Sequence, residues 1–173
     1  MDYANSPNFN VQKDQFQHPA GDPSDKTFTD LFKMMREFSN RASDQSEKQG
    51  FPVTYSDQVT LTAFSESLIW IGQSSILLNH NGFTVLTDPH FSDRASPVGF
   101  AGPKRVTPTP FQIKDLPVID VVLISHNHYD HLDRASIEDL IAYQPSIKFF
   151  VPLGLAKTLM GWGAKDVTEL DWW

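Results

Sequence analysis

The hydrophobic pattern divides the chain near residue 59. Before that point the sequence is polar, rich in Asn, Gln, Ser and Asp, and this composition is typical of a weakly ordered extension. One stretch differs, because apolar side chains recur at helical spacing and predict a short amphipathic helix near residues 28–38. Its apolar residues are Phe28, Leu31, Phe32, Met35 and Phe38. We therefore expect a polar extension over residues 1–58 and a folded domain over residues 59–173.

Beyond residue 58 the pattern becomes that of β-structure. Residues 58–88 are rich in β-branched and aromatic side chains, which favour strands. Within them Asn81 and Gly82 form an Asn-Gly pair, the strongest short signal for a two-residue hairpin turn. We predict a β-meander with a hairpin centred on this pair, and we expect His80, beside the turn, to face solvent.

A long segment rich in proline and glycine follows, over residues 89–117. Connections of more than about 15 residues without regular structure are usually functional or disordered. Phe91, Phe100 and Phe111 make this one too aromatic for a linker, so we predict an ordered loop that packs against the domain. Lys104 and Arg105 could face an anionic substrate, but we expect a structural or solvated role for them.

The rest of the chain alternates between strand and helix patterns, which is typical of an α/β fold. A strand, a helix, a strand, a helix and a strand are predicted over residues 117–125, 133–143, 147–154, 155–163 and 166–173. The first of these strands is apolar on both faces, as in a covered sheet. Ser136 and Asp139 have the spacing of a capping box for the first helix, and Asp133 is an alternative cap.

Composition narrows the function classes. The net charge of -7 over 173 residues argues against sequence-blind binding to nucleic acid, which needs a basic surface. The sequence has no cysteine, so any metal must be held by nitrogen and oxygen ligands. No apolar run approaches the length of a membrane span, and the N-terminus does not read as a signal peptide. We expect a cytoplasmic protein, with peripheral membrane contact as a further option.

The segment DVVLISHNHYDHLD, residues 120–133, carries the strongest chemical signal. His126 and His128 are two residues apart just beyond a buried strand, so an extended backbone would project both rings to the same side. Asp130 and His131 follow where the chain turns into a helix. Imidazole and carboxylate groups in such a cluster suit borderline divalent metals such as zinc. A set of solvated surface histidines is the alternative, and the close spacing favours a metal site.

Several segments together resemble one family of enzymes. These are WIGQSSILL, LTDPHFSDRASPVGFAGPKRVTP, SHNHYDHLD, FFVPLGL and ELDWW. They resemble the metallo-β-lactamase-fold hydrolases, in the branch related to N-acylphosphatidylethanolamine-hydrolysing phospholipase D, over about residues 66–173. The resemblance implies an α/β fold that is the N-terminal half of an αβ/βα sandwich. It also implies a hydrolase, of phosphodiesterase type, that acts on a phospholipid-like substrate.

The resemblance also assigns roles to individual residues. It implies two zinc ions, with iron or manganese as alternatives, and His126 and His128 would hold the first ion. Asp130 and His131 would hold the second, and Asp130 would orient the attacking hydroxide between the two metals. Asp88 would orient one of the histidines from behind, although a cap of the turn before Pro89 is an equal alternative. No substrate-binding residue is identified.

The chain departs from the family pattern in two ways. Gln73 stands where the family usually has a histidine and could alter hydrogen bonding behind the metals. No histidine follows His131, whereas the family takes further ligands from its C-terminal half. We therefore expect the N-terminal part of a longer hydrolase, inactive alone, with apolar sheet surface left uncovered. That surface would include Trp162, Trp172 and Trp173. His90 has only a small chance of being a ligand.

Two other interpretations stay open. The chain could be a non-catalytic metal-binding or interaction module, complete at this length. It could also share the fold but hydrolyse a different ester or amide, because fold does not fix substrate.

Overall fold

The computed structural model describes residues 3, 6–12, 15–16, 29, 33, 36 and 66–171. The chain divides into two compact units, Met1–Gly50 with Asp171–Trp173 and, separately, Phe51–Leu170. The expected boundary between residues 58 and 59 lies outside the described residues, as does the first part of the predicted meander, residues 58–65. The second unit carries the functional-site residues.

The first unit contains a small strand pair that its polar composition did not indicate. β1 (Phe9–Asn10) pairs antiparallel with β2 (Gln15–Phe16). The rings of Tyr3, Phe9 and Phe16 pack together with centroids 4.9 to 5.8 Å apart, so aromatic contacts hold this pair. Of the helix expected near residues 28–38, Thr29, Lys33 and Arg36 are described and helical, while its apolar residues lie outside the described set.

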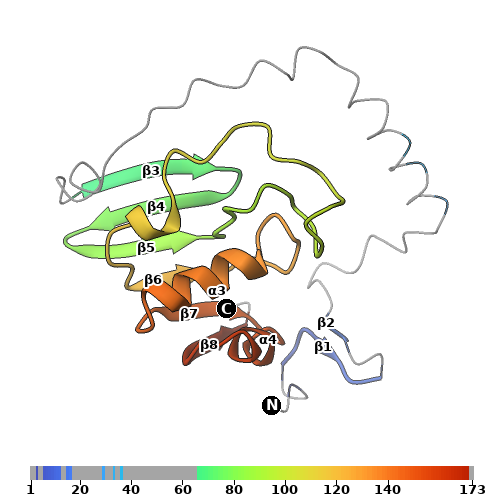
Figure 1. The fold of residues 1–173 in the computed structure, drawn as a ribbon. Helices are drawn as coiled ribbons and strands as arrows, with labels where there is room; N and C mark the ends of the chain where they lie inside the picture. The colour runs from blue at the N-terminus through green and yellow to red at the C-terminus, as the bar shows by residue number, and fades with distance from the viewer. Residues whose placement is uncertain are drawn as a thin grey trace. The chain divides into compact units, whose positions relative to one another are not determined.

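The second unit is built on a six-stranded mixed sheet in the order β3-β4-β5-β6-β7-β8 (Figure 1). The first three strands form an antiparallel meander, and β5 to β8 run parallel to one another. The strands are β3 (Glu66–Gly72), β4 (Ser75–His80), β5 (Phe83–Thr87), β6 (Val121–Leu123), β7 (Lys148–Pro152) and β8 (Asp166–Leu170). The α/β fold class predicted from the sequence is therefore confirmed.

Two tight turns connect the meander. Asn81 and Gly82 have φ angles of 51° and 78°, so the predicted hairpin between β4 and β5 is confirmed. Gln73 and Ser74 form a second turn between β3 and β4, where Gln73 has a φ of 52°. Trp70 donates its indole N–H to the carbonyl of Gln73 at 2.8 Å, which stabilises this unusual backbone. The sequence analysis did not identify this second turn.

One face of the sheet holds the core. A continuous apolar row crosses all six strands in register, formed by Ile69, Leu77, Leu86, Val122, Phe149 and Val167. It packs with residues of the helices α3 (Arg134–Tyr143) and α4 (Ala156–Gly161) and of the short 3-10 helix η2 (Ile113–Asp115). Burying each such side chain contributes about 1.5–3 kcal/mol, so this layer is the main stabilising feature of the unit.

The opposite face of the sheet carries several exposed apolar side chains. Its uncovered side chains, between 38% and 66% exposed, are Leu68, Trp70, Leu78, Phe83, Leu123 and Leu170. The expectation that Trp162 belongs to this surface is wrong, because Trp162 packs against the core beside Arg134, whose guanidinium lies 5.9 Å from the ring centroid. Trp172 and Trp173 lie outside the described residues.

Helix α3 begins at the second of the two caps predicted from the sequence. Asp133 is the N-cap residue, so the capping box expected at Ser136 and Asp139 is wrong. Ser136 is buried in the first turn, where its hydroxyl donates to Asp133 Oδ2 at 2.6 Å and accepts from the backbone N–H of Phe91 at 2.8 Å. Asp133 Oδ2 also accepts from the N–H of Ser92. The start of α3 therefore anchors the loop that leaves β5.

Residues 89–117 form the ordered loop that the aromatic residues predicted. Phe111, Ile113 and Leu116 are buried in the core, whereas Phe100 is 85% exposed. An isolated β-bridge joins Arg94 to Lys104 and closes the loop on itself. Among the residues that the structure describes, no helix is long and apolar enough to cross a membrane.

Candidate metal centre

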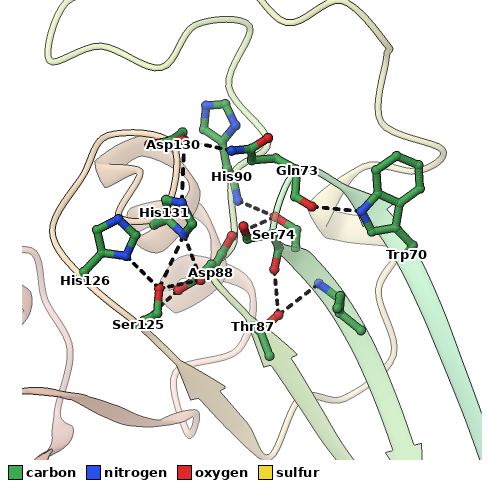
Figure 2. A network of polar contacts seen from close by, with 12 residues as sticks. Trp70, Gln73, Ser74, Thr87, Asp88, His90, Ser125, His126, Asp130 and His131 are labelled. Carbon is green, nitrogen blue, oxygen red and sulfur yellow. Dashed lines mark hydrogen bonds and ion pairs between the residues drawn. The ribbon is translucent and has the colours of Figure 1, made fainter. Parts of the chain in front are cut away.

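The candidate site lies where β5 and β6 end and the chain turns into α3. The carboxyl ends of parallel strands meet at one edge of a sheet, where ligands of α/β proteins bind. Asp88 follows β5, and the turn with the three histidines follows β6 (Figure 2). The turn between β3 and β4 contributes Gln73. The site therefore combines residues from three separate parts of the sequence.

Asp88 is the buried centre of the network. It is 5% exposed and has a φ of 37°, and its backbone N–H donates to the carbonyl of Leu123 at 2.8 Å. Its Oδ1 accepts the backbone N–H of Ser125 at 2.7 Å, and its Oδ2 accepts the Ser125 hydroxyl at 2.7 Å. The same Oδ2 lies 2.9 Å from Nδ1 of His131. The carboxylate thus faces the histidine turn.

These contacts fix the proton positions on two imidazoles. The Ser125 hydroxyl gives its single proton to Asp88, so its oxygen must accept from His126 Nδ1, which lies 2.9 Å away. The Asp88 carboxylate has no proton to give, so His131 Nδ1 is the donor in its contact with Oδ2. Both rings therefore carry their proton on Nδ1. The Nε2 atoms of His126 and His131 are left as lone-pair donors, the state that binds a metal.

The three histidine rings lie close together. The ring centroid of His126 is 4.0 Å from that of His131 and 4.5 Å from that of His128. The backbone is not the extended segment that we expected beyond the strand, because β6 ends at Leu123 and the chain turns. The carbonyl of His128 accepts the N–H groups of His131 and Leu132, at 3.0 and 2.7 Å. This turn brings His131 to the same place as His126 and His128.

The electrostatics of the cluster favour the neutral form of His126. Burial lowers the pKa of His126, and the neighbouring His131 and His128 lower it further, against a smaller raising effect from Asp88 and Asp130. A neutral ring is required for ligation, so the same crowding that disfavours protonation prepares the ring for a cation.

Asp130 reaches the cluster from the other side. Its Oδ2 accepts a hydrogen bond from Gln73 Nε2 at 2.8 Å and lies 3.5 Å from His131 Nε2. With the His131 proton on Nδ1, two acceptors face each other across this gap. A tetrahedral zinc ion lies about 2.0–2.2 Å from each of its nitrogen and oxygen ligands. Two such ligand atoms are therefore about 3.4 Å apart from each other. The spacing of this pair therefore suits a shared metal ion.

The described chain nevertheless brings together only part of a ligand set. Among residues 66–171 and the few described before them, no group of three or more His, Asp or Glu side chains is arranged to hold a metal ion. The donor types fit zinc, and the pair His131 and Asp130 has a suitable spacing. His126 and His128 lie beside this pair as neighbouring rings.

Two contacts in and near the site, one functional and one structural, were not identified from the sequence. Ser125 links Asp88 to His126, and the only sequence signal is a hydroxyl residue directly before the first histidine. Arg105 donates to His90 Nδ1 at 2.9 Å and to the Ser92 carbonyl at 3.2 Å, so it is structural, as we expected. His80 lies at the hairpin, exposed and 2.7 Å from Glu66, away from the histidine cluster.

The fold and the site together define a known class of protein. Residues 84–173, more than half of the chain, match the family model of the β-lactamase superfamily domain. The chain belongs to this family. A solved structure described as a possible metal-dependent hydrolase from Veillonella parvula superposes with a TM-score of 0.50 at 20% identity, over 63% of this chain and 45% of that one. That likeness bears on the fold alone.

Relatives of known sequence place the chain in a branch of this family. It is 38% identical to the N-acyl-phosphatidylethanolamine-hydrolyzing phospholipase D 1 of Caenorhabditis elegans, over 83% of this chain and 43% of the relative. It is 42% identical to the mitochondrial enzyme of that name from Saccharomyces cerevisiae, over 60% of this chain and 22% of the relative. An uncharacterized protein of Mycobacterium tuberculosis is 47% identical over 60% of this chain and 28% of the relative. The chain thus spans less than half the length of these relatives.

Proposed function

We propose that this chain forms the metal-binding part of a metal-dependent hydrolase of phosphodiesterase type, acting on a phospholipid-like substrate. The observation that carries the proposal is the network from Asp88 through Ser125, which sets the protons of His126 and His131 on Nδ1. Purely solvated surface histidines would not need a buried carboxylate behind them. The substrate class is supported by the names of the C. elegans and yeast relatives.

The four donors of the histidine turn would hold the metal. In this proposal His126 and His128 bind one ion and Asp130 and His131 bind a second, with Asp88 and Gln73 orienting His131 and Asp130 from behind. Bound metal would supply an activated hydroxide and neutralise charge on the phosphate. Zinc is the proposed ion, with iron and manganese as alternatives. Gln73 holds Asp130 through a single amide proton, so it keeps the carboxylate in place without adding charge.

We further propose that the exposed sheet face packs against a second layer of the same protein. Trp70 and Leu123 lie in one row of the sheet, and Leu68 and Leu78 in the next, all on the face away from the helices. An apolar area of this kind marks a contact surface. In an αβ/βα sandwich the second sheet would cover it and would bring further ligands to the metals. Peripheral contact of that complete protein with a lipid surface fits the proposed substrate.

The proposal is tested first by metal binding to this chain. Titration with zinc, followed by calorimetry and by metal analysis after dialysis, is expected to show uptake that His128→Ala abolishes. His80→Ala is the matched control, because His80 is an exposed histidine outside the cluster. Equal zinc uptake by wild type and His128→Ala would remove His128 from the ligand set.

Activity is tested in a second experiment, with a panel of phosphodiesters presented to the zinc-loaded protein of natural length. The Asp130→Asn variant is expected to bind part of the zinc that wild type binds and to lose most of the hydrolytic activity. Zinc uptake without turnover of any phosphodiester, ester or amide would favour the non-catalytic module. Turnover of an ester or amide alone would favour a hydrolase of the same fold with other chemistry.

A further inference from the structure

Gln73 occupies a strained turn position and also makes a contact at the metal centre. Its φ of 52° lies in the left-handed region, which glycine and asparagine adopt far more readily than glutamine. Its side-chain amide donates to Asp130 Oδ2 at 2.8 Å (Figure 2). A strained backbone whose side chain reaches a functional residue indicates that the strain serves the site. The contacts that hold Gln73 in this conformation therefore bear on Asp130.

Trp70 holds the backbone of Gln73. Its indole N–H donates to the Gln73 carbonyl at 2.8 Å, three residues further along the chain. An indole has a single donor and no acceptor, so this contact uses its whole hydrogen-bonding capacity. The ring is 57% exposed on the exposed sheet face, where the other uncovered side chains are leucines and a phenylalanine. Trp70 therefore gives the turn a hydrogen bond as well as giving that face apolar area.

The residues on either side of Gln73 are tied to other parts of the fold. The Ser74 carbonyl accepts a hydrogen bond from the Thr87 hydroxyl at 2.8 Å, which joins the turn to β5. A Cβ atom at Gly72, whose φ is 140°, would lie 3.2 Å from Nη1 of Arg105, so this guanidinium lies against the turn. The carbonyl of Gln73, between these two anchored residues, is the part of the turn that the indole N–H fixes.

The contact from Gln73 to Asp130 depends on a preorganised turn. The hydrogen bond is exposed, so water competes for both its donor and its acceptor. A glutamine side chain also loses rotamer freedom when it binds, and a backbone that is already fixed lowers the total entropic cost. The Oδ2 atom of Asp130 that accepts this hydrogen bond is the one that lies 3.5 Å from His131 Nε2. The donor that holds this oxygen therefore sets the spacing of the proposed metal-binding pair.

We propose that Trp70 is a positioning residue, because its indole N–H holds Gln73 and Gln73 in turn holds the Asp130 carboxylate at the metal centre. The inference rests on the proposed function, in which Asp130 is a metal ligand. It adds a residue that acts on the site through Gln73 and that lies on the exposed sheet face. The second layer proposed to pack on that face would therefore cover the residue that holds Asp130.

Zinc affinity of single variants provides the first test. Trp70→Phe keeps an aromatic ring and removes the N–H, and Gln73→Leu keeps a side chain of similar size and removes the amide. Loss of a contact behind a ligand costs about 10–100-fold in metal affinity. We expect zinc binding about tenfold weaker for Gln73→Leu and about three- to tenfold weaker for Trp70→Phe, which acts one step further from the metal. Wild-type zinc affinity of Trp70→Phe would overturn the proposal.

The double variant separates positioning from a general effect on the sheet. If Trp70 acts through Gln73, adding Trp70→Phe to Gln73→Leu should cause little further loss, whereas independent effects on zinc affinity would multiply. Multiplied losses would overturn the proposal. Tyr143→Phe is the control, because it removes the hydroxyl of an exposed ring at the last residue of α3 and should bind zinc like wild type.

The wild-type chain provides a further test that needs no variant of Trp70. Its four tryptophan indole N–H groups give separate signals in nitrogen NMR. Zinc that fixes Asp130 should slow the exchange of the Trp70 indole proton with solvent, because coupling between two sites acts in both directions. The slowing should be absent in Gln73→Leu. A Trp70 exchange rate that bound zinc leaves unchanged in wild type would overturn the proposal.

The outcomes separate this inference from the proposed function. Zinc binding that neither Trp70→Phe weakens nor the Trp70 indole proton reports would leave the metal centre standing and overturn the role of Trp70. A chain that binds no zinc would contradict the metal centre, and solvent exchange of the Gln73 side-chain amide protons in the metal-free chain would then decide the inference. Faster exchange of these protons in Trp70→Phe than in wild type would support the positioning role, and equal exchange would overturn it.

Discussion

Asp88 and Ser125 are joined by two hydrogen bonds of 2.7 Å, one from the backbone N–H and one from the hydroxyl of the serine, to the two oxygens of the carboxylate. The two residues follow neighbouring parallel strands and are separated by 37 positions in the sequence. This double contact fixes the orientation of the carboxylate, and through it the protons of His126 and His131. The network behind the histidines is therefore as important for the proposed metal site as the histidines themselves.

Removal of the Ser125 hydroxyl is predicted to weaken metal binding. In Ser125→Ala, His126 Nδ1 loses its acceptor, and the ring can take the other tautomer or rotate. Loss of such a contact behind a ligand costs about 10–100-fold in metal affinity, which zinc competition titration measures. Ser146→Ala, at an exposed serine after α3, is the control and should bind zinc like wild type. An unchanged affinity for Ser125→Ala would contradict the tautomer assignment.

The apolar row across the sheet is predicted to dominate stability. Phe149 is 1% exposed at the centre of the core, so Phe149→Ala should lower the free energy of unfolding by about 3–5 kcal/mol. Phe100→Ala removes an exposed ring from the loop and should change it by less than about 0.5 kcal/mol. Urea unfolding monitored by circular dichroism compares the two. Similar losses for both variants would show that the loop is a larger part of the core than its exposure indicates.

The hairpin between β4 and β5 is predicted to depend on Gly82. A side chain there meets no atom within 4 Å, but the φ of 78° strains any residue with a Cβ. Gly82→Ala should therefore lower the free energy of unfolding by about 1–2 kcal/mol, through backbone strain alone. Gly161 also has open space around its Cβ position, but it ends helix α4 without a positive φ. Gly161→Ala should leave the free energy of unfolding unchanged or raise it by up to about 1 kcal/mol. Thermal unfolding monitored by circular dichroism compares the two variants.

Acidification is predicted to destabilise the second unit through His90. The folded-state pKa of His90 lies below its ordinary value near 6.5, so the unfolded chain binds the proton more readily. The contribution of His90 to the free energy of unfolding should therefore be fully present above about pH 6.5. It should decrease as the pH falls from there towards the lower folded-state pKa. Unfolding curves between pH 8 and 5 should show a smaller acid-induced loss in His90→Gln than in wild type. His80→Gln is the exposed control, and an identical pH profile for wild type and His90→Gln would exclude His90 as the cause.

Local patterns predicted the elements of the sheet well. Alternating and apolar runs located the strands and both helices of the second unit, because their side chains form one continuous buried layer. The Asn-Gly pair at residues 81 and 82 gave the hairpin, since its backbone angles are a property of those two residues. The turn at Gln73 was missed because its conformation depends on the hydrogen bond from Trp70, and Gln is not a typical turn residue.

The histidine turn could be predicted as a cluster, but its supporting contacts could not. Four donors within six positions are close in any compact conformation. The partner of Asp130 is Gln73, 57 positions away, and only the folded sheet brings them together. The cap of α3 shows the same limit, because Ser136 has the right spacing for a cap yet is used inside the helix to hold Phe91. Sequence spacing describes what a side chain can do locally, and tertiary partners decide among the options.

The metal site depends on the alignment of β5 with β6. Val85 pairs with Val121 and Thr87 with Leu123, and this register brings Asp88 within hydrogen-bond distance of Ser125. A slip by one residue would turn the carboxylate to the other face of the sheet and would leave His126 and His131 without their hydrogen-bond partners. Metal affinity and strand alignment are therefore thermodynamically linked. A bound ion would raise the free energy needed to separate these two strands.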